Sequence, residues 1–96
     1  MYMRGKQDNN QKDVVDALEK AGALVLDMTH VANGFPDLLV GIRGKFILME
    51  IKNLKTAYGR KGLNPNQVAW HAKWQGYPIS LVDGPEAALR AIGCIK

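Results

Sequence analysis

The sequence predicts an α/β domain in which a mixed central sheet is flanked by helices, with elements in the order αβββαβα. Apolar residues recur at helical spacing near the start of the chain. Short apolar runs separated by turn residues fill the middle, and two segments with helix-starting signals enclose a last short strand. The 96 residues suffice for one core. We therefore expect a single domain over residues 1–96, with residues 1–8 flexible.

The first helix is expected from about residue 9 to residue 21, where Val14, Val15 and Leu18 have helical spacing and Gly22 follows as a stop. The apolar run at residues 23–28 predicts a strand. Residues 29–36 then form a loop that contains glycine and proline.

A central hairpin is predicted by two apolar runs, residues 37–42 and 46–51, on either side of Arg43-Gly44-Lys45. Glycine at the middle position can adopt the positive φ that a tight turn needs. The remaining elements are a basic loop over 53–65, a helix capped by Asn64 or Asn66 and extending to about residue 75, a strand over 78–82 and a helix over 86–92.

The hairpin would bring three charged side chains together at one end of the sheet. A turn centred between Arg43 and Gly44 places Asp37 opposite Glu50, where Cβ atoms are only about 5 Å apart. Alternation then puts Lys52 on the face of Glu50 and turns the residue between them away. A one-residue bulge would offset this pairing.

Two carboxylates that converge in this way suit a hard divalent cation, because Mg²⁺ and Mn²⁺ prefer oxygen ligands. Asp37 and Glu50 are the candidate ligands, and the backbone carbonyl of Ile51 is a further one. Lys52 is a candidate for holding or deprotonating the attacking water in phosphodiester hydrolysis, and its positive charge makes positioning the simpler role. The alternative is an ordinary salt bridge at a sheet edge.

The charge distribution favours a polyanionic partner. The net charge is +4, and residues 51–82 contain no Asp or Glu but five basic residues: Lys52, Lys55, Arg60, Lys61 and Lys73. We expect Lys55, Arg60 and Lys61 to contact DNA phosphates. A solvated lysine-rich loop is the alternative, and charge alone does not decide between them.

Composition argues against several other classes of protein. No apolar run approaches the roughly 20 residues of a membrane span, and the start of the chain lacks an apolar signal core. A lone cysteine, Cys94, excludes an internal disulfide and fits a reducing cytoplasm. It also makes a zinc site improbable, since His30 and His71 lie in distant segments. Trp70 and Trp74 share a helix face, for which core packing is the default interpretation and base stacking the alternative.

The chain resembles the PD-(D/E)XK nuclease superfamily, and within it the small stand-alone VRR-NUC domains of phages and bacteria. The resemblance covers about residues 10–92 and follows the restriction-endonuclease-like order of elements. The matching pieces are Leu18-Glu19-Lys20-Ala21-Gly22, Gly34-Phe35-Pro36-Asp37-Leu38-Leu39-Val40, Met49-Glu50-Ile51-Lys52, Gly62-Leu63-Asn64-Pro65-Asn66-Gln67 and Gly76-Tyr77-Pro78.

The resemblance implies a Mg²⁺- or Mn²⁺-dependent DNA endonuclease whose catalytic residues are Asp37, Glu50, Lys52 and Gln67. Gln67 would orient Lys52 or a water. The family usually has an acid near the start of the first helix, for which Asp8 is the candidate here. Relatives often carry arginines before the glycine of the second motif; here His30 stands in that loop and is a candidate for one phosphate contact.

The resemblance further implies a homodimer that acts on branched DNA such as Holliday junctions, because cutting two strands symmetrically needs two sites. The expected location is cytoplasmic, in the bacterial host cell if the protein is phage-encoded. Two alternatives stay open: a nicking, flap or generic duplex nuclease with the same chemistry, and a nuclease-like fold that serves only as a DNA-binding module.

Overall fold

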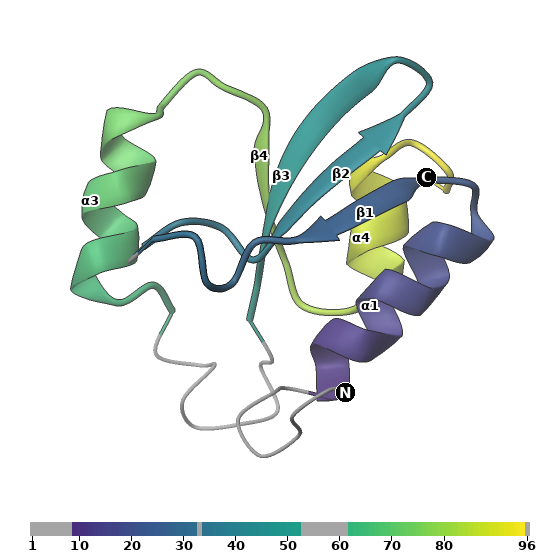
Figure 1. The fold of residues 1–96 in the computed structure, drawn as a ribbon, viewed down its shortest axis with the longest axis horizontal. Helices are drawn as coiled ribbons and strands as arrows, with labels where there is room; N and C mark the ends of the chain where they lie inside the picture. The colour runs from purple at the N-terminus through teal and green to yellow at the C-terminus, as the bar shows by residue number, and fades with distance from the viewer. Residues whose placement is uncertain (1–8, 33, 53–61, 96) are drawn as a thin grey trace.

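A computed structural model describes residues 9–32, 34–52 and 62–95, and its strands form one mixed sheet (Figure 1). The predicted α/β class and order of elements are confirmed over this part of the chain. No helix within these ranges has both the length and the hydropathy to span a bilayer. The elements are α1 (Asn9–Lys20), β1 (Leu24–Asp27), β2 (Leu38–Ile42), β3 (Lys45–Ile51), α3 (Pro65–Lys73), β4 (Ile79–Val82) and α4 (Pro85–Ala91).

Helix α1 forms because its apolar residues fall on one side, where Val14 and Leu18 are fully buried. It ends at Gly22, whose φ of 95° is favourable only for glycine. The N–H of Gly22 donates to the carbonyl of Glu19, and the N–H of Ala23 donates to that of Leu18. This pair of bonds is a Schellman motif, which satisfies carbonyls at the helix end and turns the chain into β1.

The sheet has the strand order β1-β2-β3-β4, with β1, β2 and β3 antiparallel and β4 parallel to β3. A two-residue turn joins β2 to β3, in which Arg43 and Gly44 both have positive φ, at 51° and 78°. Leu38 pairs with Met49. Continuing that register by one residue sets Asp37 beside Glu50, so the pairing predicted from the turn is confirmed.

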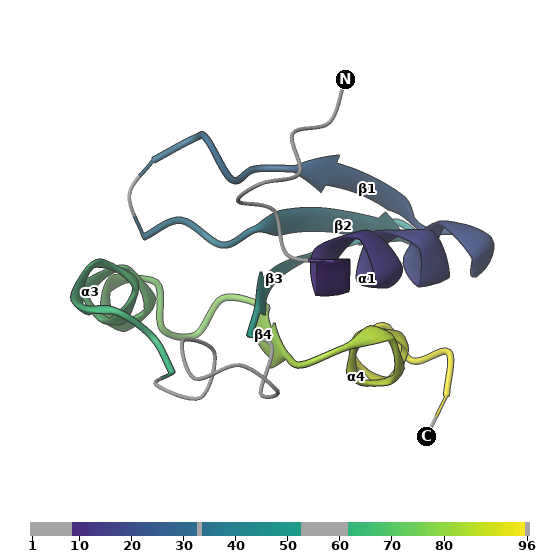
Figure 2. The same ribbon diagram turned by 90° about the horizontal axis from the view of Figure 1, so that it is seen from below.

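One face of the sheet packs against α1 and α4, which lie side by side (Figure 2). Alternate residues of three strands point to this face and meet apolar side chains of both helices. Burial of this cluster excludes water from the main core of the domain. Its buried members are Val14, Leu18, Ala23, Leu38, Val40, Met49, Ile51, Val82, Ala88 and Ile92.

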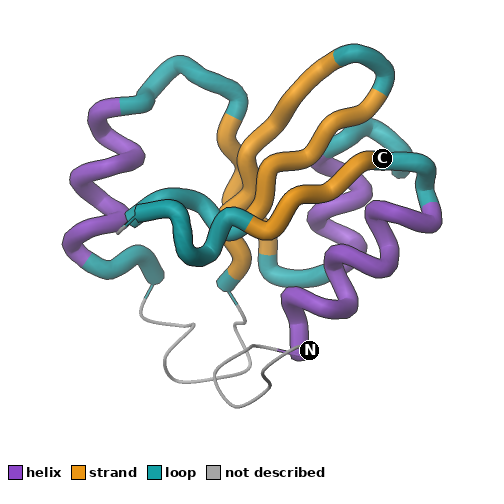
Figure 3. Tube along the Cα trace, viewed as in Figure 1, coloured by secondary structure: helices purple, strands orange, loops and turns teal. Residues whose placement is uncertain are grey.

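Helix α3, the remaining described helix, does not cover the opposite face of the sheet. Helix α3 stands beyond the end of the sheet and lies between β3 and β4 in the chain (Figure 3). None of the described helices therefore covers the alternate residues of the opposite face. We call it the open face, and by strand register it comprises Leu24, Leu26, Leu39, Gly41, Phe46, Leu48, Ile79 and Leu81, with Glu50 at the end nearest α3.

Candidate active site

The structure brings four of the predicted residues together where β2 begins and β3 ends. Asp37 and Glu50 lie side by side through the hairpin register, and the charge of Lys52 acts on both carboxylates. Gln67 reaches the same place from α3. Residues from three separate segments thus converge on one point.

Asp37 is held by the backbone of the neighbouring strand. Its Oδ2 accepts a hydrogen bond of 2.8 Å from the N–H of Ile51, while its own carbonyl accepts one of 2.7 Å from the N–H of Met28. Burial raises the pKa of Asp37, and the N–H of Ile51 and the charge of Lys52 oppose that rise. Both contacts fix the position of this carboxylate before any ligand arrives.

Glu50 is unusually buried for an ionisable side chain, since only 1% of its surface is exposed. Its Oε2 accepts a 2.7 Å hydrogen bond from Gln67, but its buried Oε1 has no hydrogen-bond partner in the described chain. Burial, followed by repulsion from Asp37, raises the pKa of Glu50 from its ordinary 4.5 to about 8. Near neutral pH this carboxyl therefore holds its proton unless a cation is present.

Gln67 is oriented by the start of its own helix. Asn64 caps α3, and its side chain accepts a 2.9 Å hydrogen bond from the N–H of Gln67. The side-chain oxygen of Gln67 in turn accepts one of 2.9 Å from the N–H of Asn64. This capping box leaves the Nε2 end of the amide directed at Glu50. The helix cap thus places Gln67 on Glu50, whereas the family resemblance implied Lys52 or a water.

Lys52 lies immediately after β3 and is only 6% exposed. Its backbone N–H donates a 2.9 Å hydrogen bond to the carbonyl of Val82, which continues the pairing of β3 with β4 past the end of the strand. An ammonium group rarely becomes this buried unless negative charge faces it. Asp37 supplies that charge, and Glu50 adds to it once its carboxyl loses the proton.

His71 is a candidate site residue that sequence reasoning set aside. Its Nε2 lies 3.9 Å from Oε1 of Glu50, and this buried nitrogen also has no hydrogen-bond partner among the described residues. Burial and then the charge of Lys52 lower the pKa of His71, which favours the neutral imidazole. The sequence does contain one signal that could have found His71: it lies four residues after Gln67, so the two side chains share one face of α3.

Gly34 allows α3 to approach the site closely. It has φ of 84°, and a Cβ there would lie only 2.4 Å from the carbonyl oxygen of Asn66. The ring of Phe35 packs edge-on against Trp70, with centroids 5.0 Å apart. The loop before Asp37 and the first turn of α3 therefore fit against each other, which sets the distance between Gln67 and Glu50.

The chemistry of these groups fits a divalent cation. Two neighbouring carboxylates have raised pKa values, and one buried oxygen, Oε1 of Glu50, is unpartnered. The N–H and C=O of one strand residue face the same neighbouring strand, so the carbonyl of Ile51 is directed to the side of Asp37. Within the described chain no three His, Cys, Asp or Glu side chains are grouped to hold a metal. Two carboxylates, a carbonyl and waters make a donor set typical of Mg²⁺.

The other predicted residues are not brought to this point by the described structure. His30 is exposed on the loop between β1 and β2. Asp8, the candidate first-helix acid, and the predicted phosphate contacts Lys55, Arg60 and Lys61 all lie outside the described residues. Their roles stay predictions.

The described start of α1 contributes a buried amide that contacts the end of β1. Gln11 is 7% exposed, and its Nε2 donates a 3.3 Å hydrogen bond to Asp27 at the end of β1. The negative charge of Asp27 raises the pKa of Asp37, so this carboxylate lies within electrostatic reach of the site. Asp27 also accepts hydrogen bonds from the N–H and hydroxyl of Thr29.

Comparison with solved structures finds a VRR_NUC domain that is 26% identical in sequence and superposes with a TM-score of 0.66. The match covers 88% of this chain and 90% of that one. Comparison with models of protein families gives no match, and neither does comparison with curated proteins. The structural match confirms the resemblance found in the sequence: the chain has the fold of a VRR-NUC domain.

Proposed function

We propose that this VRR-NUC domain is a DNA endonuclease that hydrolyses phosphodiester bonds with the help of Mg²⁺ or Mn²⁺. The observation that carries the proposal is the pair of adjacent carboxylates, Asp37 and Glu50, with an unpartnered buried oxygen and a nearby buried ammonium. Such a group of charges is costly to bury without a cation and an anionic substrate to complete it.

Each side chain has a distinct role in this proposal. Asp37, Oε1 of Glu50 and the carbonyl of Ile51 would hold the cation. When bound, it would supply Lewis-acid polarisation of the scissile phosphate and acidification of the attacking water. Lys52 is placed to position that water and to stabilise negative charge on the phosphate. Gln67 binds Oε2 of Glu50, which leaves Oε1 for the cation.

The number of sites in one chain supports a proposal about substrate and assembly. The set of Asp37, Glu50 and Lys52 occurs once in a chain of 96 residues, so two strands would be cut symmetrically only by two copies. We therefore propose a homodimer that acts on branched or duplex DNA, including Holliday-junction-like substrates. The acid-free stretch of residues 51–82, with Lys55, Arg60 and Lys61, would supply phosphate contacts.

The test is a cleavage assay on linear and branched DNA with Mg²⁺, Mn²⁺ or EDTA. We expect cleavage with either metal, none with EDTA, and none with Asp37→Ala or Lys52→Ala. Asp16→Ala is a matched control, because it removes an exposed carboxylate of α1 that pairs with Lys12 within its helix. Wild-type protein that binds DNA but cuts none of these substrates under any metal would contradict the proposal and favour a DNA-binding module.

A further inference from the structure

Two buried polar atoms of the candidate site face each other without a hydrogen bond. They are Oε1 of Glu50 and Nε2 of His71, which lie 3.9 Å apart. Among the described residues, these are the two buried side-chain nitrogen or oxygen atoms that lack a hydrogen-bond partner. Because such atoms are costly to bury, two of them side by side indicate a shared purpose.

The distance between the two atoms excludes a direct bond. Hydrogen bonds from nitrogen to oxygen span about 2.7–3.2 Å, so 3.9 Å is too long for one. An ion pair would need a protonated imidazole, but burial and then the charge of Lys52 lower the pKa of His71. The neutral imidazole is the form that binds metals. The pair is therefore suited to contact a third group.

The spacing of the pair suits two ligands of one cation. An imidazole nitrogen and a carboxylate oxygen each lie about 2.0–2.2 Å from a first-row divalent cation, so two such ligands are at most about 4.4 Å apart. At right angles around the cation they would be roughly 3 Å apart, so a shift of about 1 Å would seat both. No three His, Cys, Asp or Glu side chains are grouped in the described ranges, so the cation would draw His71 toward the carboxylates.

Helix α3 directs His71 at the same carboxylate that Gln67 binds. The two residues are four apart and share one face of the helix. Gln67 donates to Oε2 of Glu50, whereas Nε2 of His71 lies nearest to Oε1. The ring of Trp70 meets the imidazole edge-on, with centroids 5.5 Å apart. One turn of helix thus serves both oxygens of Glu50.

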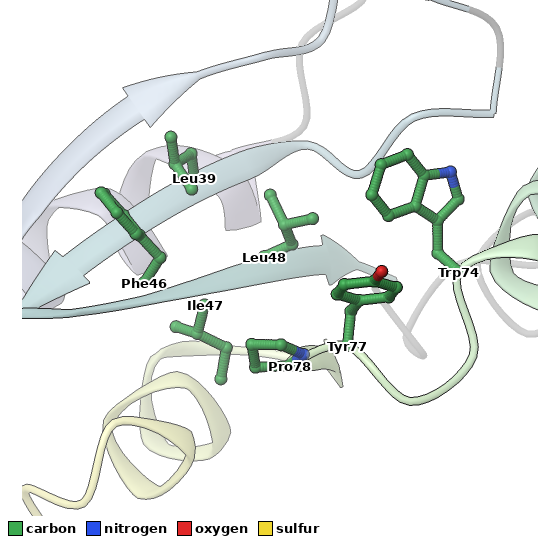
Figure 4. A pocket seen from close by; sticks show the side chains of 7 residues that line it. All are labelled: Leu39, Phe46, Ile47, Leu48, Trp74, Tyr77 and Pro78. Atoms are coloured by element: carbon green, nitrogen blue, oxygen red, sulfur yellow. The ribbon is translucent and has the colours of Figure 1, made fainter.

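The surface beside the end of α3 offers the imidazole no polar partner. A depression of about 270 Å³ lies there, and its lining is apolar and aromatic, with Leu48, Trp74 and Tyr77 among its members (Figure 4). His71 is not one of the residues that line it. The polar surroundings of Nε2 are therefore those of Glu50.

We propose that His71 is a nitrogen ligand of the cation held by Asp37 and Glu50, and that it makes the site prefer first-row transition cations such as Mn²⁺ over Mg²⁺. The presence of a cation rests on the proposed function. Oxygen ligands alone suit Mg²⁺ and Mn²⁺ alike. Mg²⁺ keeps its waters and prefers oxygen, whereas transition cations bind imidazole well. One nitrogen therefore changes the choice of metal without altering the carboxylates.

The decisive test is pulsed electron paramagnetic resonance of Mn²⁺ bound to the full-length protein without DNA, which detects nitrogen coupled to the metal. The chain has two histidines, and labelling them alone with ¹⁵N identifies an imidazole signal. We expect this signal in wild type and its loss in His71→Gln. The matched control is His30→Gln, which removes the exposed imidazole of the loop after β1 and should keep the signal.

Calorimetric titration of Mn²⁺ and Mg²⁺ measures the metal preference. His71→Gln should weaken Mn²⁺ binding by at least the about 10–100-fold that loss of an outer-shell partner costs. It should weaken Mg²⁺ binding much less, because water replaces the nitrogen. His30→Gln should leave both affinities unchanged. Thermal melting in EDTA shows whether the variants are folded as wild type is.

A wild-type Mn²⁺ spectrum without imidazole coupling overturns the inference, and that result depends on no variant. So does a folded His71→Gln protein whose preference between Mn²⁺ and Mg²⁺ is unchanged, which is the outcome expected if water bridges the two atoms. Cleavage assays separate this inference from the proposed function. Imidazole-bound Mn²⁺ in a protein that cuts no DNA would contradict the nuclease alone, and Mn²⁺-dependent cleavage without imidazole coupling would contradict the role of His71 alone.

Discussion

Helices α1 and α3 are attached to the same sheet in opposite ways. Helix α1 is held by apolar burial, with Val14 and Leu18 fully enclosed in the core. Helix α3 has no buried residue, and its attachments are the bond from Gln67 to Glu50, the close approach at Gly34 and aromatic contacts. One helix thus stabilises the domain, while the other completes a candidate site whose charged groups are themselves costly to bury.

The largest effect that this comparison predicts is on catalysis. Glu50→Gln keeps the volume of the side chain and an oxygen to accept from Gln67, but removes the charge that the cation needs. We expect cleavage to fall on the order of 10³-fold or more, since the loss of the cation forfeits several kcal/mol of transition-state stabilisation. Initial rates on junction DNA provide the measurement. Asp16→Asn, which neutralises an exposed acid, should cut normally, and a Glu50→Gln enzyme with near wild-type rate would refute the role of this carboxylate.

The next effect concerns stability and contrasts the two helices directly. Leu18→Ala should lower the free energy of unfolding by about 2–5 kcal/mol, because it leaves a cavity in the core. Val68→Ala on α3 should change it by no more than about 0.5 kcal/mol, since that side chain is exposed. Urea unfolding of both variants tests the contrast. Equal losses would show that α3 contributes to the core after all.

The stability of the metal-free protein should depend on pH through Glu50, which belongs to the candidate site, whereas the apolar core has no group that titrates. Because the pKa of Glu50 is raised from 4.5 to about 8, the metal-free fold binds this proton more tightly than the unfolded chain does. The stabilisation that this protonated carboxyl gives the metal-free fold is therefore fully present below about pH 4.5 and is lost as pH rises through about 8. In EDTA the melting temperature should fall by several degrees over this window, on the order of 5 °C or more. Glu50→Gln should flatten that part of the profile; a fall of the same size in this variant would assign the dependence to other groups.

The smallest effect tests how α3 serves the site. Gln67→Ala removes the hydrogen bond to Oε2 of Glu50 and should weaken metal binding about 10–100-fold. Its cost in stability should be near 1 kcal/mol, the usual size for one hydrogen bond. Mn²⁺ titration gives the affinity and thermal melting the stability. Gln75→Ala, at an exposed glutamine after the same helix, is the control. A large loss of stability without a change in metal affinity would make Gln67 a structural residue only.

The hairpin register and the helix ends were predictable from the sequence, because they depend on residues that are close together in the chain. The turn at Arg43 and Gly44 fixes the hairpin register, and that register alone places Asp37 beside Glu50. The stop at Gly22 and the cap at Asn64 are likewise short-range signals. Such features depend on neighbours in sequence, so a single chain reveals them.

What sequence reasoning missed depends on packing between distant segments. The approach of His71 to Glu50 follows from how α3 meets the loop at Gly34, and periodicity cannot show that contact. The open face arises because α1 and α4 cover the same side of the sheet, whereas the sequence predicted only a sheet flanked by helices. Leu24 and Phe46 have the same apolar character as core residues, and the fold alone decides which of them stay exposed.

The central claim is that Asp37 and Glu50 form a site that a divalent cation completes. Calorimetric titration of Mn²⁺ into the protein at pH 7, in buffers of different ionisation enthalpy, tests it most directly. Metal ligands must be deprotonated, and the pKa of Glu50 of about 8 means that this carboxyl is largely protonated beforehand. We predict binding that releases close to one proton, and no such release in Glu50→Gln. Absence of binding, or binding with the same proton count in both proteins, would contradict the claim.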